Sequence, residues 1–244
     1  MGLRAILTGL TISLCAGTAA NAADFGTGPG SLLDAPFAVT PWNWGGFYGG
    51  WIVGYGTGDS SNYVSNNANV HGWASNNPDG VLLGGTVGYN WQYTPNWVLG
   101  VEADMSWADM QGNQHMYIYD GHDWSGGWDG FGTIRGRVGY DFGRTLVYGT
   151  GGIAFLHTNE VIVGNDADET NFNQGWHVGY AVGAGVEQMI TDRLSAKAEF
   201  LFAGGFPEWS GKTGTVSQTQ STQYWKHDEG SIDIIRVGLN YKFF

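Results

Sequence analysis

The sequence holds a single cysteine and has no long apolar run beyond its first 23 residues. That cysteine, Cys15, lies in a segment that we expect to be removed on export, so the mature chain relies on its fold without disulfides. No later stretch approaches the roughly 20 apolar residues that a membrane helix needs. This absence excludes a helical membrane protein.

Charged residues are few, at 13% of the chain, whereas glycine and aromatic residues are many. The chain has 42 Gly and 12 each of Phe, Trp and Tyr, far from the composition of an average soluble domain.

The chain begins with a basic residue, Arg4, an apolar run at 5–16 and the small-residue cleavage site Ala20-Asn21-Ala22, an order typical of a secretory signal peptide. We therefore expect a signal peptide at 1–22, a Gly/Pro-rich lead at 23–43 and one folded unit at 44–244.

The folded unit consists of eight runs of alternating residues. Three of the connections between them are very short, at 94–96, 143–144 and 191–193, and four are long, at 57–80, 108–129, 157–174 and 205–230. Short turns at one end and long loops at the other are typical of an outer-membrane barrel. The runs lie at 44–56, 81–93, 97–107, 130–142, 145–156, 175–189, 194–204 and 231–244.

Side chains in a strand alternate between its two faces, and most runs divide into an apolar set and a polar set. The run at 145–156 is too rich in glycine and apolar residues for its faces to be assigned. Val-Gly-Tyr recurs at 53–55, 87–89, 138–140 and 178–180 and puts its glycine on the polar face each time, which suits a narrow interior. The last run sets Ile235, Val237, Leu239, Tyr241 and Phe243 against Arg236, Gly238, Asn240 and Lys242.

A soluble lipocalin-like barrel would also have eight strands and a signal peptide, but it would turn its apolar face inward around a ligand. The bulky apolar residues of most runs would not fit that interior. In water they would far exceed the roughly 300 to 600 Å² apolar patch of a soluble monomer, whereas in lipid they stabilise the fold. The sequence therefore predicts an all-β protein, an eight-stranded antiparallel up-and-down transmembrane β-barrel with short periplasmic turns and four long extracellular loops.

Several motifs, in order along the chain, resemble those of the small porin-like outer-membrane immunogenic proteins of alphaproteobacteria. They are WGGFY at 44–48, GYNWQ at 88–92, GVEAD at 100–104, GTIRGR at 132–137, YGTGG at 148–152, GAGVE at 183–187 and RVGLNYKF at 236–243. The resemblance covers nearly all of the mature chain. It implies an abundant barrel in the outer membrane of a Gram-negative bacterium, with envelope-structural and surface-interaction roles and with some haem-binding members.

The polar faces of the runs carry charges of both signs. An unpaired charge inside so narrow a barrel would be costly, whereas paired and hydrogen-bonded charges are accommodated. We therefore expect an ion-pair network that closes the lumen and sets whether the barrel conducts, in place of a water column that screens each charge separately. Its expected members are Glu102, Asp104, Asp141, Glu187 and Glu199 with Arg135, Arg137, Lys197, Arg236 and Lys242.

The end of the chain alternates in a way that resembles the C-terminal signal recognised by the outer-membrane assembly machinery. The family usually ends on a single aromatic residue, whereas here an extra one follows, which leaves open which of the two the machinery reads. The residues of this expected signal are Val237, Leu239, Tyr241, Phe243 and Phe244.

Histidines in the long loops suggest two alternatives. His71, His115, His122 and His227 lie there, close in sequence to Met116, Tyr117, Tyr119, Asp120 and Asp123, and haem iron accepts His or Tyr as an axial ligand. No His pair has the spacing of a zinc site, so we expect no cofactor and keep surface haem binding as an alternative. His122, Asp123 and Ser125 could serve a hydrolase, but the Gly-x-Ser-x-Gly motif is absent, so we expect no enzyme activity.

Acidic residues outnumber basic ones by 22 to 10, and most of the resulting net charge of −12 falls in the long loops. This sign excludes nucleic acid as a partner. The loop carboxylates either keep the loops solvated or share divalent cations with lipopolysaccharide phosphates, since carboxylate oxygens suit Ca²⁺ and Mg²⁺. The expected partners are outer-membrane lipid and lipopolysaccharide, the assembly machinery, and host or phage surface molecules.

The function that these features predict is a structural and surface-interaction role in the cell envelope. The alternative from another class is a narrow porin-like channel for ions or small solutes, and surface haem binding comes third. Conductance in planar bilayers distinguishes the first two, and a Soret shift on titration tests the third.

The mature protein should begin at Ala23 or Asp24, because Ala20-Asn21-Ala22 supplies the cleavage site. N-terminal sequencing of the protein taken from the outer-membrane fraction checks this expectation. A retained Met1 would contradict it.

Overall fold

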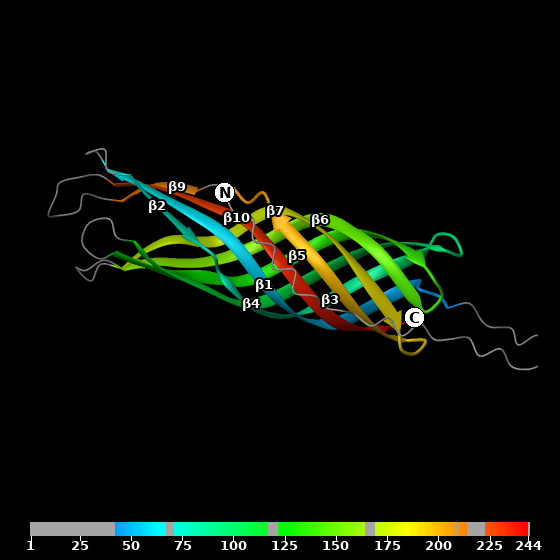
Figure 1. Ribbon diagram of the computed structural model, residues 1–244. Helices are drawn as coiled ribbons and strands as arrows, with labels where there is room; N and C mark the ends of the chain where they lie inside the picture. The colour runs from blue at the N-terminus through cyan, green and yellow to red at the C-terminus, as the bar shows by residue number, and fades with distance from the viewer. Residues whose placement is uncertain are drawn as a thin grey trace, which may run out of the picture. The chain divides into compact units, whose positions relative to one another are not determined.

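The structure, a computed structural model, describes residues 42–66, 71–116, 122–163, 169–207, 209–213 and 223–243. These residues form antiparallel strands and turns, and they include no helix that is long and apolar enough to cross a membrane. The strands are β1 (Gly46–Asn66), β2 (His71–Asn76), β3 (Asp79–Gln92), β4 (Trp97–Met116), β5 (His122–Asp141), β6 (Thr145–Val163), β7 (Glu169–Met189), β8 (Leu194–Gly204), β9 (Trp209–Thr213) and β10 (Gln223–Lys242) (Figure 1).

Eight of these strands close into a barrel. β1, β3, β4, β5, β6, β7, β8 and β10 pair in that order, and β10 pairs back onto β1, beside which it lies in Figure 1. β2 pairs with the outer part of β1, between Ser60 and Ser65, and β9 pairs with the outer part of β10, between Gln223 and His227. The predicted eight-stranded antiparallel barrel is confirmed.

Three tight turns join the strands at the end of the barrel where the chain enters β1 and leaves β10. The amide of Tyr93 donates to the Trp97 carbonyl at 2.9 Å and that of Ile190 donates to the Leu194 carbonyl at 2.8 Å. Gly143 has a φ of 89°, in the left-handed region that glycine reaches without a steric penalty. These turns coincide with the short connections expected from the sequence and mark the periplasmic end.

At the opposite end the strands run beyond the runs expected from the sequence. β4 extends to Met116 and β5 starts at His122, so much of the connection at 108–129 continues the β4–β5 ladder. Register shifts occur at Trp107/Met110 and Trp128/Gly130, where expected runs end and begin, and at Glu160/Val161, beyond the end of the expected run at 145–156. Continuing the ladder pairs the backbone groups of these segments, and each bulge absorbs an extra residue that alternation alone does not reveal.

The two faces of the wall separate apolar from polar side chains as expected. On β10, Leu239 and Tyr241 are exposed on the outside, whereas Arg236 and Asn240 are buried inside. β6, whose faces the sequence left unassigned, turns Leu146, Tyr148, Ala154 and Leu156 inward and Val147 and Ile153 outward. The outward set forms the apolar band that faces lipid.

Glycines on the two faces differ in the space around them. A methyl group at inward-facing Gly84 would lie 2.2 Å from the Met105 carbonyl oxygen, and one at Gly88 would lie 2.4 Å from the Tyr48 hydroxyl. A methyl group at outward-facing Gly85 would meet no atom closer than 3.6 Å. These inward glycines therefore make room for neighbouring backbone and lumen side chains, whereas the outward Gly85 leaves open space.

Gly84→Ala should destabilise the barrel by about 1 to 3 kcal/mol, because the β4 backbone would have to move. The adjacent Gly85→Ala should change the free energy of unfolding by less than about 1 kcal/mol, towards higher stability, since its methyl group has room and restricts the unfolded chain. Urea unfolding of the refolded protein, followed by tryptophan fluorescence, measures both. Equal losses for the two variants would show that lumen space is not what selects glycine.

Candidate functional site

The barrel lumen contains a group of eight buried charged side chains. Strand alternation turns them inward, and the register places Glu102 opposite Arg135 and Glu199 opposite Arg236 on neighbouring strands. Four are carboxylates and four are cations, so the group is neutral overall. We name it the lumen network: Glu102, Asp104, Glu187 and Glu199 with Arg135, Arg137, Lys197 and Arg236, each at most 7% exposed.

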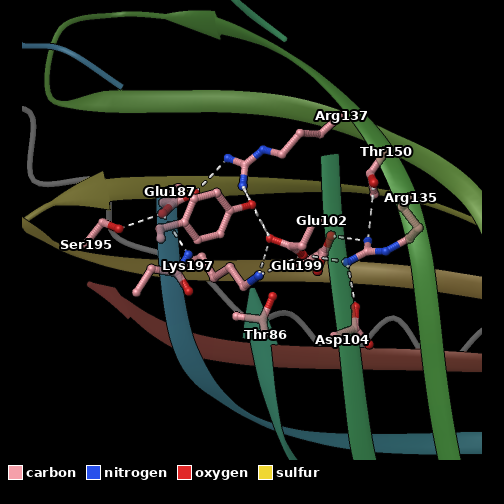
Figure 2. Close-up of polar contacts among 12 residues, drawn as sticks. Thr86, Glu102, Asp104, Arg135, Arg137, Thr150, Glu187, Ser195, Lys197 and Glu199 are labelled. Carbon is pink, nitrogen blue, oxygen red and sulfur yellow. Dashed lines mark hydrogen bonds and ion pairs between the residues drawn. The ribbon is translucent and has the colours of Figure 1, made fainter. Parts of the chain in front are cut away.

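Glu102 lies at the centre of the lumen network (Figure 2). Its Oε1 accepts from Arg135 Nη2 at 2.6 Å and from Lys197 Nζ at 2.9 Å. Its Oε2 accepts from the Tyr48 hydroxyl at 2.8 Å and from Arg137 Nη1 at 3.4 Å. One carboxylate thus joins side chains from β1, β4, β5 and β8.

A second part of the network lies around Asp104 and Glu199. Asp104 Oδ2 accepts from Arg135 Nη2 and Arg236 Nη2, each at 3.0 Å, and from the Thr133 hydroxyl at 2.6 Å. Glu199 accepts from Arg135 Nη1 at 2.6 Å and from Arg236 Nε at 2.7 Å. Because Arg135 also binds Glu102, the two parts form one continuous set of ion pairs.

Glu187 forms the third part, nearer the periplasmic end. Its Oε2 accepts from Arg137 Nη2 at 2.7 Å, and its Oε1 accepts from the Ser195 hydroxyl at 2.5 Å and from Asn240 Nδ2 at 2.9 Å. The Arg137 guanidinium lies 4.2 Å from the ring centroid of Tyr148, which adds a cation–π contact. Each carboxylate of the lumen network therefore has at least one charged partner.

Asp141 and Lys242, also expected in the network, lie away from it. Each is the last residue of its strand, so both lie at the periplasmic edge. Asp141 accepts from Gln92 Nε2 at 3.2 Å and from the Gly143 amide at 2.6 Å. Lys242 Nζ donates to the Asn43 carbonyl at 2.5 Å. The structure thus brings together eight of the ten expected residues, and the strand ends explain the other two.

Apolar layers lie on both sides of the lumen network. The periplasmic layer consists of Trp44, Val98, Leu146, Tyr148 and Met189. The extracellular layer is larger and comprises Leu82, Ala108, Met110, Trp128, Phe131, Ala154, Leu156, Ala181, Leu201, Ala203, Phe206, Ile232 and Ile234. A cavity beside Phe131 and Arg236 has a volume of only about 10 Å³, and a cleft at the periplasmic turn between β7 and β8 has about 20 Å³, which is room for at most one or two waters.

Two tyrosines contribute to the network without having been expected from the sequence. Tyr48 hydrogen-bonds to Glu102, and its ring lies beside inward-facing Gly88. Tyr148 lies beside Gly185 in the same way. Glycine on the strand next to an aromatic residue is the signal that would have placed both in the lumen.

The residues of the expected assembly signal lie on the outside of β10 at its periplasmic end. Val237, Leu239, Tyr241 and Phe243 are all exposed on the lipid-facing side, while Phe244 lies outside the described residues. The Phe243 amide donates to the Phe47 carbonyl at 2.9 Å, so the chain end is paired across the closing seam.

The loop positions considered for haem or hydrolysis have no described side chains. This holds for His71, His115, His122 and His227, for Met116 and Tyr117 to Asp120, and for Asp123 and Ser125. Two other histidines are described: His157 pairs with Asp129, and His177 Nε2 lies 3.2 Å from the Thr158 hydroxyl. In the described part of the chain, no three His, Cys, Asp or Glu residues gather as a metal site would require.

Residues 10–243 match the family model described as the outer membrane protein beta-barrel domain. The chain is 31% identical over 231 residues to the 31 kDa outer-membrane immunogenic protein of Brucella melitensis, covering 88% of this chain and 89% of the relative. It is 32% identical over 208 residues to the 22 kDa outer membrane protein of Rhizobium leguminosarum, covering 82% and 79%.

A solved structure supports the fold. The outer membrane protein OprG from Pseudomonas aeruginosa aligns with a TM-score of 0.50 over 82% of this chain and 96% of that chain, at 14% sequence identity. At this identity the likeness concerns the barrel alone.

Glu102→Ala should lower the free energy of unfolding by about 3 to 5 kcal/mol, because it leaves buried cations without a carboxylate. Asp109→Ala is the matched control, since Asp109 is an exposed carboxylate on the same strand, and it should change the value by less than about 0.5 kcal/mol. Urea unfolding in detergent micelles measures both. Similar values for the two variants would mean that water already screens Glu102.

Proposed function

The chain belongs to the outer-membrane β-barrel protein family, and from this premise we propose that it acts as a closed structural barrel of the outer membrane whose outer end presents loops for surface interactions. The barrel and the outer-membrane location follow from the family and the fold. The closed lumen and the surface role are the finer part of the proposal.

The observation that carries the proposal is the charge-balanced lumen network between two apolar layers. Arg135 alone binds three carboxylates from two strands, which cross-links the wall and fills its middle. A charge crossing the apolar layer around Phe131 and Leu156 would lose its hydration with no partner there to replace it. These two different barriers in series support a sealed barrel rather than a narrow channel.

The outer end supports a role at the cell surface. Described acidic side chains lie on the outside of neighbouring strands just above the apolar band: Asp59, Asp79, Asp109, Asp129 and Asp233. We infer that this charge keeps the loops solvated for contact with host or phage molecules, and that it meets lipopolysaccharide phosphates through shared divalent cations. The names of the relatives describe outer-membrane proteins, one of them immunogenic, and no reaction, which supports a non-catalytic role.

Wild-type protein should give no steady current in a planar bilayer. Glu102→Ala and Phe131→Ala should each permit only brief openings, because the other barrier remains. The double variant Glu102→Ala/Phe131→Ala should conduct measurably. Single-channel recording in KCl compares the three proteins.

The matched control is Asp109→Ala/Phe200→Ala, which removes the same two kinds of side chain from the outer surface. This control should behave as the wild type does. A steady wild-type current that neither lumen variant alters would overturn the closed-lumen proposal in favour of a channel.

A further inference from the structure

The outside of the barrel carries opposite charges at its two ends. At the extracellular boundary the described charged side chains on the outer face are the carboxylates named above. At the periplasmic edge, Arg144 and Arg193 lie in the tight turns with Asp192 beside Arg193, and Lys242 lies next to them on the inward-facing side of β10. An anion next to the wall is therefore favoured at the periplasmic edge and disfavoured at the other end.

Arg193 and Lys242 lie together at this edge. The Lys242 amide donates to the Arg193 carbonyl at 2.7 Å, and the Lys242 ammonium lies within reach of both the Asp192 carboxylate and the Arg193 guanidinium. The Arg193 side chain is exposed and hydrogen-bonds to Tyr241 on the lipid-facing side. The exposed Arg193 guanidinium is the cation of this pair that an anionic group beside the wall would meet.

An apolar furrow of about 1,100 Å³ on the outer surface begins at Leu194, the residue after Arg193, and at Tyr241, which pairs with Leu194 across the strands. Its periplasmic end is lined by Leu194, Tyr241 and Phe243, and outward glycines such as Gly85 keep its floor low. This volume is slightly above the range of small-molecule sites, which span roughly 300 to 1,000 Å³.

The furrow climbs the wall towards the extracellular side. Its lining follows the cross-strand pairs from Tyr241 to Gly49, and onward through Val87 and Ala103 to Ile134. Gly49 lies three residues from the start of β1 at Gly46, whereas Ile134 lies seven residues from the end of β5 at Asp141. The furrow therefore leads from the periplasmic edge into the hydrocarbon region.

We propose that Arg193 and this furrow bind an anionic glycerophospholipid of the inner leaflet, with its phosphate at Arg193 and one acyl chain along the furrow. Lipid tails are as apolar as the furrow itself, so any acyl chain that matches its shape can lie in it. The preference for an anionic headgroup then comes from Arg193. Lipopolysaccharide does not fit, because its phosphates lie in the other leaflet, where the outer face is acidic. The site is independent of whether the lumen conducts.

Native mass spectrometry tests the headgroup part of the site. The mature protein is reconstituted in vesicles of equimolar dioleoyl phosphatidylglycerol and dioleoyl phosphatidylethanolamine, and the retained lipids are counted after release. Wild-type protein should retain phosphatidylglycerol in preference. Arg193→Gln should lower that preference about fivefold, which corresponds to about 1 kcal/mol for one basic residue at an anionic lipid surface.

Arg144→Gln is the matched control for charge, since Arg144 lies on the same edge, over Trp42 and away from the furrow. Gly85→Leu should fill the furrow and reduce total retained lipid, whereas Gly136→Leu, at an open outward glycine off the furrow, should not. A heat-modifiability gel shows whether Gly85→Leu folds. If it does not, Trp51→Ala, which removes one wall of the furrow, should likewise reduce total retained lipid.

Three outcomes would overturn the proposal. The first is equal retention of the two lipids by the wild type. The second is an equal effect of Arg144→Gln and Arg193→Gln, which would indicate a diffuse attraction along the edge. The third is unchanged retention in the two furrow variants.

Discussion

Neutralising the Glu102 carboxylate inside a narrow closed wall is the interaction on which the rest of the lumen depends. A barrel leaves no strand edge unpaired in lipid, and eight strands leave an interior that side chains must fill. Glu102 binds Arg135, Arg137, Lys197 and Tyr48, so its position fixes side chains from three other strands. The remaining carboxylates then complete the partners of the same arginines.

The apolar layers and the ion pairs reinforce each other. Leu146 and Met189 on one side and Phe131 and Ile234 on the other keep water away from the charges. In such a low-dielectric setting each correct pair is stronger and each missing partner is more costly. The layered lumen therefore specifies one arrangement of the wall as well as stabilising it.

Much of this architecture follows from sequence alternation, because a two-residue period forces each side chain to one face. On β10 the period separates Arg236 from Val237 without ambiguity. On β6 it fails, since Tyr148 and Leu156 are inward yet chemically resemble the outward set. The position of Asp141 and Lys242 at the periplasmic edge, away from the lumen network, could not be predicted either. Alternation indicates which face of the wall a side chain lies on, but not where it lies along the barrel axis. The bulges near Trp107 and Trp128 depend on pairing between strands, which a single strand does not encode.

The closing seam between β1 and β10 has a consequence for the order of assembly. If the charges of the lumen network are added in chain order, the running total is −1 after Glu102 and −2 after Asp104. It returns to zero after Arg137 and alternates between −1 and zero thereafter. Glu199 leaves it at −1, and Arg236 on the final strand returns it to zero. A nascent barrel that lacks β10 therefore carries both an open seam and an unbalanced carboxylate. The strand that closes the wall on β1 therefore also supplies the last cation of the lumen network, through its pairing with β8.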